Sequence, residues 1–283
     1  MVVFLGLRRF YHTTLGHPFR LAVRLDEGQG TPIIFLHGIA ADYRIWSNTL
    51  SQLQGTGRLI ALDLLGCGES PNPSYLDYTV NEHAKSVILT LRSLRINEPI
   101  VLVGHSLGSL VALEVARIEP ELVSRLILAS PPIFTKDING LASQIKNSLY
   151  NSAYLAVIRQ PRLTTEATVL VQRLQPNESN YAVTKDSWTS FRQTLQNAVL
   201  DQANYNTLLA TTIPTDIVYG RFDVLILKKP LTTAVEKNNH LAFHRINEPH
   251  EITSTYSNYI VKLIRFILHD VEARRPPFTD KNL

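Results

Sequence analysis

The amino-acid sequence predicts an α/β protein built on a mostly parallel sheet of about eight strands, with helices on both faces. Short apolar runs of strand length alternate with longer amphipathic segments, which is the pattern of β-α-β units. One long stretch interrupts this alternation with helical patterns only, and it predicts an inserted helical cap. No internal repeat or low-complexity tract is present, so a repeat architecture is excluded.

The first half of the chain supplies most of the predicted core. Residues 32–38 form an apolar run that ends at a glycine, and residues 43–54 show the spacing of an amphipathic helix. The alternation continues with strands at 58–63, 99–104 and 123–130 and helices at 79–94 and 106–118. The opening stretches "FLGLRRFYHTT" and "FRLAVRLDEG" predict an antiparallel hairpin added at the sheet edge.

The alternation of predicted strands and helices stops after residue 130 and resumes near residue 215. Residues 136–205 are predicted to form the cap, and residues 1–135 and 206–283 to form the core. Strands resume at 215–220 and 241–246 with a helix between them, and a last helix runs from about His250 to His269. The cap carries apolar residues at spacings that suit core packing or a pocket: Leu149, Tyr150, Tyr154, Leu155, Ile158, Trp188, Phe191 and Leu195.

Composition narrows the class of protein. Apolar residues make up 45% and charged residues 18%, which fits a globular chain and excludes disorder outside the polar tail from Arg274. The net charge of +4 comes from scattered basic residues, so no nucleic-acid partner is expected. No stretch approaches the length of a transmembrane helix, and no secretory signal opens the chain, so we expect a cytoplasmic protein without a membrane partner. Either a monomer or a homodimer is compatible with the sequence.

One short motif carries the chemistry. Gly104-His105-Ser106-Leu107-Gly108 fits G-x-S-x-G and lies between a predicted strand and a predicted helix, as the nucleophile elbow of a serine hydrolase requires. The alternative is an ordinary turn, but the flanking elements favour a nucleophile. In such a turn the side chain of Ser106 projects from the sheet edge, whereas His105 points away from it and is expected to be structural.

A serine nucleophile needs a base and a carboxylate further along the chain. Asp223 lies three residues after the strand that ends at Gly220, whereas its rival Asp216 lies at the start of that strand, the wrong end of a parallel sheet. His250 follows the last strand by four residues and is the predicted base. The other downstream histidines are less well placed: His244 within the strand, His240 before it and His269 at the end of the last helix.

An oxyanion hole is predicted from the loop after residue 36. The backbone amides of Ile39 and Leu107 would bind the developing negative charge. His37, Gly38 and Trp188 are predicted to contact the substrate. Cys67, the only cysteine, excludes an intrachain disulfide and a cysteine-based zinc site, and we read it as a small residue in a turn.

Together these stretches resemble the α/β-hydrolase fold superfamily over nearly the whole chain. The matching segments are "LHG" (36–38), "DLLGCGES" (63–70), "GHSLG" (104–108), "YGRFD" (219–223) and His250. The second is similar to the family's D-x-P-G-x-G-x-S loop, with Leu65 in place of proline. The resemblance implies a triad of Ser106, Asp223 and His250 under a helical cap. It departs from the family at Pro249, because a glycine usually precedes the histidine.

The predicted reaction is hydrolysis of a carboxylic ester of a small or medium apolar substrate, with no cofactor and no metal. Ser106 argues against the related haloalkane dehalogenases and epoxide hydrolases, because they resemble this fold but use an aspartate at the elbow. A carbon–carbon bond hydrolase, thioesterase, lactonase or amidase remains an alternative. A ligand receptor of the same fold with little turnover is an alternative of another class.

Overall fold

The computed structural model describes residues 9–12, 14–134, 183–184, 186–201 and 203–273. Of the predicted cap, residues 136–182 lie outside the described residues, and with them the apolar residues from Leu149 to Ile158. The six parallel strands predicted between residues 32 and 246 are all described, and each lies within two residues of its predicted bounds.

Seven strands form one sheet in the order β1-β3-β2-β4-β5-β6-β7. Their bounds are β1 Val23–Glu27, β2 Pro32–Leu36, β3 Arg58–Leu62, β4 Ile100–His105, β5 Val123–Ala129, β6 Thr215–Gly220 and β7 Leu241–Ile246. Strand β1 pairs antiparallel with β3, and the other six strands are parallel. Since the carboxyl ends of the parallel strands share one edge, the loops after β2, β4, β6 and β7 gather there.

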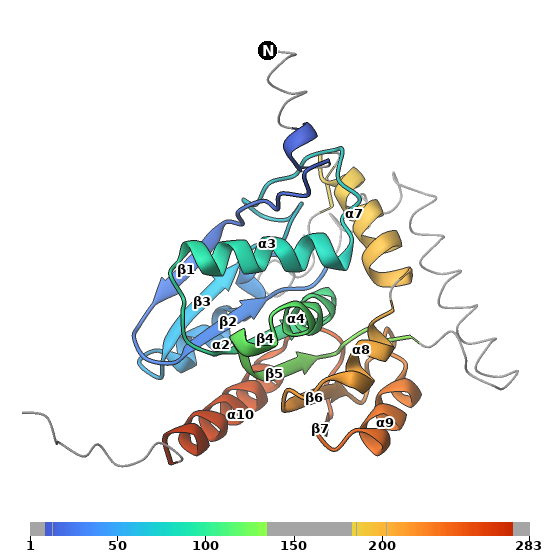
Figure 1. The fold of residues 1–283 in the computed structure, drawn as a ribbon. Coiled ribbons are helices and arrows are strands. Elements are labelled where there is room, and N and C mark those ends of the chain that lie inside the picture. Colours follow the sequence, from blue (N-terminus) through green and yellow to red (C-terminus); the bar gives the residue numbers. More distant parts are fainter. Residues whose placement is uncertain (1–8, 13, 135–182, 185, 202, 274–283) are drawn as a thin grey trace, which may run out of the picture.

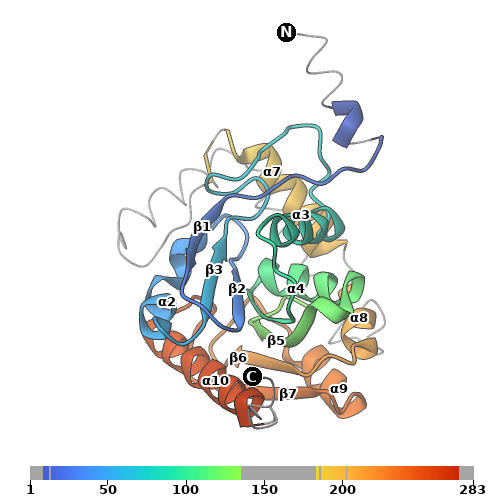
Figure 2. The ribbon, with the colours of Figure 1, turned by 60° about the vertical axis from the view of Figure 1, so that its left-hand side comes forward.

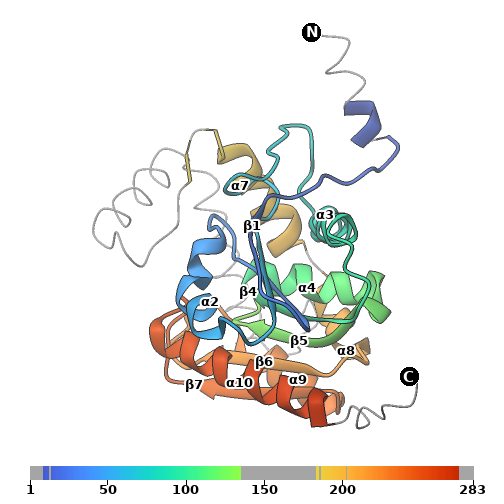
Figure 3. The same ribbon diagram turned by 90° about the vertical axis from the view of Figure 1, so that its left-hand side faces the viewer.

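Helices cover both faces of the sheet (Figure 1, Figure 3). On one face lie α3 (Val80–Ser93), α4 (Leu107–Ile118), α8 (Asn204–Ala210) and α9 (Lys228–Lys237), and on the other lie the short helix Tyr43–Trp46, α2 (Ser47–Leu53) and α10 (Ser254–Ala273). Alternate strand residues enter the two cores, as Ile34 and Ile33 of β2 do. Because both faces are covered, the strands read as unbroken apolar runs rather than as an alternation.

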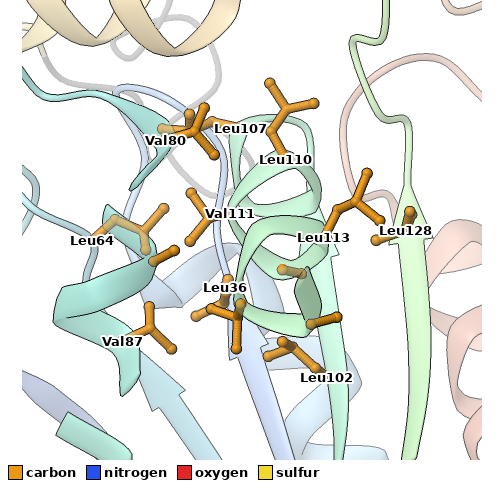
Figure 4. Close-up of a cluster of buried hydrophobic side chains, with 14 of the residues drawn as sticks. Leu36, Leu64, Val80, Val87, Leu102, Leu107, Leu110, Val111, Leu113 and Leu128 are labelled. Carbon is orange, nitrogen blue, oxygen red and sulfur yellow. The ribbon is translucent and has the colours of Figure 1, made fainter. Parts of the chain in front are cut away.

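Helix α4 lies at the centre of the larger core. Figure 4 shows its Val111 on the side of α4 that faces Val87 of α3, and its Leu113 on the other side, next to Leu128 of β5. All four side chains are buried. The helix that begins at the predicted nucleophile turn is therefore held on a rigid surface.

The predicted amino-terminal hairpin is wrong for residues 9–12, whereas residues 4–8 and 13 of its first half lie outside the described residues. Residues 9–12 form a helical turn, closed by the Thr14 N–H donating to the Phe10 carbonyl at 2.9 Å. The ring of His12 stacks on Phe19 at 3.5 Å between centroids, and Phe19 is buried in the core. These local contacts favour the turn over a strand, and β1 pairs with β3 instead of with a hairpin partner.

The carboxyl-terminal part of the predicted cap is described and is helical. It consists of α7 (Trp188–Thr194), a π-helical turn (Leu195–Leu200) and the start of α8. Helix α7 lies beside the loop after β3 (Figure 2). Asn72 donates through Nδ2 to the Asp186 carbonyl at 3.1 Å, and a Cβ on Gly66 would lie 2.5 Å from the Cβ of Ser190. This part of the cap is thus packed closely on the core.

Among the helices that the structure describes, none combines the length and the apolar character needed to cross a membrane.

Candidate active site

The predicted nucleophile lies at the junction of β4 and α4. Ser106 separates the two elements and has φ 51° and ψ −117°, a conformation that L-residues rarely adopt. Such a backbone costs on the order of 1–3 kcal/mol and persists where the surrounding structure holds it. The Ser106 N–H donates to the Ala129 carbonyl of β5 at 2.9 Å, so the turn is fixed to the neighbouring strand.

The two glycines of the motif are required by close backbone contacts. A Cβ on Gly104 would lie 2.3 Å from the Gly108 carbonyl oxygen, and a Cβ on Gly108 would lie 2.3 Å from the Leu36 carbonyl oxygen. The glycines therefore allow the turn to close and let α4 approach the end of β2, which leads into the predicted oxyanion loop.

Replacing Gly108 with alanine is expected to lower the free energy of unfolding by about 3 kcal/mol, because the methyl group would push against a backbone carbonyl. Urea denaturation measures the change. Gly55→Ala is the control, because its Cβ meets nothing within 4 Å and only its φ of +74° is strained. Destabilisation no larger than that of Gly55→Ala would contradict the close approach.

The structure brings Asp223 and His250 together. The loops after β6 and β7 carry them, and His250 Nδ1 lies 2.8 Å from Asp223 Oδ2. Asp223 is buried, and its Oδ1 accepts the Leu225 N–H at 2.9 Å. The ionised carboxylate only accepts hydrogen bonds, so Nδ1 carries the proton and the lone pair of Nε2 is available to act as a base.

His250 also lies next to the nucleophile turn. The rings of His105 and His250 are 4.9 Å apart between centroids, and His105 directly precedes Ser106. Within the described ranges, no hydrogen bond joins the Ser106 hydroxyl to His250. Proton transfer between them therefore requires a rotation of the serine side chain or a small approach of the ring, as is common before substrate binds.

The predicted oxyanion loop lies against the nucleophile. A Cβ on Gly38 would be 3.3 Å from the Cβ of Ser106, so the chain passes close to the serine just before Ile39. Leu107 is the first residue of α4, where the backbone N–H groups have no acceptor within the helix. Both predicted amide donors thus lie beside the serine turn.

His37 holds this loop in place. Its Nε2 accepts the Leu64 N–H at 2.9 Å, so Nδ1 carries the proton and donates to the Gly38 carbonyl at 2.7 Å. The side chain is completely buried, and burial lowers the pKa of His37. The sequence suggests that His37 contacts substrate, but both of its ring nitrogens bind backbone groups, whereas Gly38 does lie beside Ser106.

The loop Asp63–Ser70 is built around the Asp63 carboxylate. Its two oxygens accept the N–H groups of Tyr43 and Glu69, each at 3.0 Å. A Cβ on Gly68 would lie 2.0 Å from Asp63 Oδ2, which explains the second glycine of the motif. Burial raises the pKa of the Cys67 thiol to about 12, so this cysteine stays protonated and is no nucleophile near neutral pH.

A cavity of about 340 Å³ opens beside the oxyanion loop. Its lining includes Ile39, Leu65 and Cys67 from the core loops, and Ser190 and Phe191 from α7. Trp188, which the sequence proposes as a substrate contact, is not part of this lining and instead packs on Phe191 at 5.7 Å between ring centroids. The aromatic residue of α7 that lines the cavity is thus Phe191, three residues after the predicted Trp188.

The fold is that of the α/β-hydrolase class. A family model described as the alpha/beta hydrolase fold matches residues 31–225, and the chain belongs to that family. The match covers the predicted oxyanion loop, the serine turn and Asp223, but ends before His250.

Individual relatives are more distant. An uncharacterized protein of Mycobacterium tuberculosis is 37% identical over 145 residues, which is 51% of this chain and 41% of that protein, so the chain matches about two fifths of that relative's length. A cis-3-alkyl-4-alkyloxetan-2-one decarboxylase of Shewanella oneidensis is 24% identical over 88% of this chain and 85% of its own. Among solved structures, a thermophilic esterase from Thermogutta terrifontis shares 21% identity with a TM-score of 0.69 over 89% of this chain and 93% of its own.

Proposed function

We propose that this hydrolase is a serine esterase that cleaves a carboxylic ester of a small or medium apolar substrate through an acyl-enzyme intermediate. The observation that carries the proposal is the pair His250–Asp223, 2.8 Å apart, next to a strained serine turn. The pair leaves the Nε2 lone pair of His250 free, and the turn presents a hydroxyl at the start of a helix. This combination activates a serine nucleophile.

The reaction follows from the positions of these groups. His250 Nε2 accepts the Ser106 proton while Oγ bonds to the ester carbonyl carbon, and the amides of Ile39 and Leu107 bind the resulting oxyanion. One such amide donor contributes about 10²–10³ in rate. The alcohol leaves with the proton from His250, and a water activated by the same nitrogen then releases the acid and restores the serine.

An apolar substrate is supported by the loop that carries the catalytic acid. Phe222 and Val224 flank the buried Asp223 and are 60% and 75% exposed, and Leu225 is 38% exposed. A cluster of exposed apolar side chains is typical of a binding surface, whereas single ones are common anywhere. The cavity beside the oxyanion loop is lined by Ile39, Leu65 and Phe191 among others, and none of the three proposed triad residues is part of its lining.

A serine nucleophile is unsuited to dehalogenation, because the covalent intermediate could not be hydrolysed. Displacement of a halide by the Ser106 hydroxyl would leave an alkyl ether on the enzyme. An ether has no carbonyl carbon that water could attack, so the enzyme would stop after one turnover. An acyl group on the same oxygen is an ester, which His250 and water can cleave.

A β-lactone is the second candidate substrate. The relative from Shewanella oneidensis, which covers 88% of this chain, is named for an alkyl-substituted oxetan-2-one, a four-membered lactone. Attack of Ser106 on a lactone carbonyl uses the same groups as attack on an open-chain ester. The two candidates differ in whether the leaving alcohol stays attached to the acyl group.

The test is to trap the acyl-enzyme with p-nitrophenyl esters of increasing chain length. After rapid acid quench, mass spectrometry of the peptide that contains Ser106 is expected to show the mass of the acyl group. Lactone substrates run in parallel distinguish the second candidate. Binding of esters without turnover and without acylation would instead support the receptor alternative. The cytoplasmic location stays a prediction of the sequence.

A further inference from the structure

We propose that His105 is a positioning residue, whose neutral imidazole holds the base loop and the oxyanion loop in register with the serine between them. The proposal rests on the proposed function, since it concerns the placement of His250 and Ser106. His105 is the last residue of β4 and is buried, with 1% of its surface exposed. Its side chain contacts both loops, at Gly38 and at the His250 carbonyl.

The first contact of His105 is with the backbone of the predicted base. Its Nε2 lies 2.8 Å from the carbonyl oxygen of His250. Because a carbonyl oxygen only accepts hydrogen bonds, Nε2 must carry the ring proton and donate it. His250 is thus fixed at two points, its ring nitrogen by Asp223 and its backbone by His105.

The second contact is with the predicted oxyanion loop. Because the proton is on Nε2, Nδ1 of His105 is unprotonated and carries a lone pair. This nitrogen has no hydrogen-bond partner. A Cβ on Gly38 would lie 3.1 Å from this nitrogen, so the Cα of Gly38 packs directly against it. A proton on Nδ1 would have no acceptor here, which favours the tautomer with the proton on Nε2.

The surroundings keep the ring in this single state. Burial, together with the neighbouring His250, lowers the pKa of His105 to about 3, so the imidazole is neutral under ordinary conditions. Trp46 packs edge-on against the ring, at 6.5 Å between centroids and 87° between planes. A flipped ring would place the Nε2 proton away from the His250 carbonyl and leave that acceptor unpaired.

His105 therefore limits the freedom of the base. With Asp223 alone, the imidazole of His250 can pivot about one hydrogen bond, and the approach to Ser106 varies with the loop. A displacement of about 1 Å in a catalytic group can reduce a rate by about 10²-fold. The hydrogen bond from His105 to the His250 carbonyl fixes the backbone of His250, so the ring that this backbone carries is also fixed.

The test compares His105→Leu, which removes the donor, with His105→Gln, which places an amide donor at a similar reach. His83→Leu is the matched control, because His83 is also completely buried, has a pKa lowered to about 3, and has no hydrogen-bond partner on either ring nitrogen. It lies on α3 and forms no hydrogen bond with either loop. Measured quantities are kcat and KM for a p-nitrophenyl ester and the free energy of unfolding.

We expect His105→Leu to lower kcat by about 10- to 100-fold with little change in KM, because the base is misplaced and the ester is still bound. His105→Gln should recover most of kcat, and His83→Leu should keep it. If kcat of His105→Leu equals that of His83→Leu, the role of His105 is structural only and the proposal is wrong.

A second measurement separates this proposal from the proposed function. The Nδ1 proton of His250, shared with Asp223, gives a far-downfield proton NMR signal when the pair is ordered. Loss of that signal in folded His105→Leu, but not in His83→Leu, supports positioning even if the wild type hydrolyses no ester. An unchanged signal together with unchanged kcat overturns the positioning role and leaves the esterase proposal intact.

Discussion

Ser106→Ala is expected to lower kcat for ester hydrolysis by about 10⁴- to 10⁶-fold and to leave the fold intact, since removal of a triad serine takes away the nucleophile. Alanine keeps the Cβ, so the turn at φ 51° is no more strained than before. The Ser106 hydroxyl makes no hydrogen bond to His250 within the described ranges, so its loss breaks no bond of that pair. Initial rates with the ester series and thermal unfolding measure both effects.

Ser109→Ala is the matched control for this prediction. The Ser109 hydroxyl is buried one turn into α4 and donates to the carbonyls of Gly104 at 2.7 Å and Ala129 at 3.1 Å. Its removal should reduce the free energy of unfolding by about 1–3 kcal/mol, because the Gly104 carbonyl loses the hydroxyl proton, whereas the Ala129 carbonyl still accepts the Ser106 N–H. Activity measured well below the unfolding temperature should persist. Unchanged hydrolysis by Ser106→Ala would show that the nucleophile is misassigned.

His250→Ala is expected to reduce kcat as severely as the loss of the serine, about 10⁴- to 10⁶-fold, because the two residues act as one unit. No other histidine in the described part of the chain forms a hydrogen bond with Asp223. The change is measured with the same esters and the same unfolding assay. Added imidazole should restore part of the activity if the cavity left by the ring admits it.

The chain offers a second aspartate–histidine pair as a control. His244 Nε2 lies 2.8 Å from Asp216 Oδ1, the same separation as in the proposed catalytic pair. Burial would raise the pKa of Asp216, but hydrogen bonds from His244 and Arg125 outweigh it and hold the pKa below its usual value. His244 also bonds to the Tyr259 hydroxyl of α10.

Asp216 lies near the start of β6, whereas Asp223 follows the end of that strand. His244→Ala is therefore expected to keep kcat and to lower the free energy of unfolding by about 1–3 kcal/mol. The two alanine variants thus exchange their effects: one loses activity, the other stability. An inactive His244→Ala beside an active His250→Ala would reverse the assignment of the base. Two aspartate–histidine pairs with equal spacing show that geometry alone does not identify a base, and that a neighbouring nucleophile must complete it.

The sequence predicts the strands and helices of the core well because local apolar pattern and burial agree in a doubly covered parallel sheet. The run Ile33–Leu36 is apolar because helices cover both faces of the sheet there. The glycines Gly38 and Gly104 lie where another part of the chain passes close by and leaves little room for a side chain. The pattern fails at residues 9–12, where stacking on Phe19 decides the conformation. Such a contact, between residues seven positions apart in the chain, leaves no trace in the periodic pattern of apolar residues from which helices and strands are predicted.

The candidate site is predicted in its residues but not in its hydrogen bonds. Position along the chain is sufficient to favour Asp223 and His250, whereas the donor and acceptor roles of a ring nitrogen depend on partners brought together by folding. His105 and the His250 carbonyl are 145 positions apart. One signal was present in the sequence: most buried polar side chains form at least one hydrogen bond, so an imidazole beside the serine turn in a buried region favours a polar contact there.

The burial of histidines around the site also decides how the fold responds to acid. His37, His83 and His105 are all buried, and their pKa values in the folded chain lie below the ordinary 6.5, at about 3 for the last two. Below pH 6.5 the unfolded chain binds protons that the folded chain refuses, so protonation favours unfolding. The free energy of unfolding therefore falls as the pH drops from 6.5 towards 3, and the oxyanion loop and the base loop, which His37 and His105 hold, lose these supports over the same pH range.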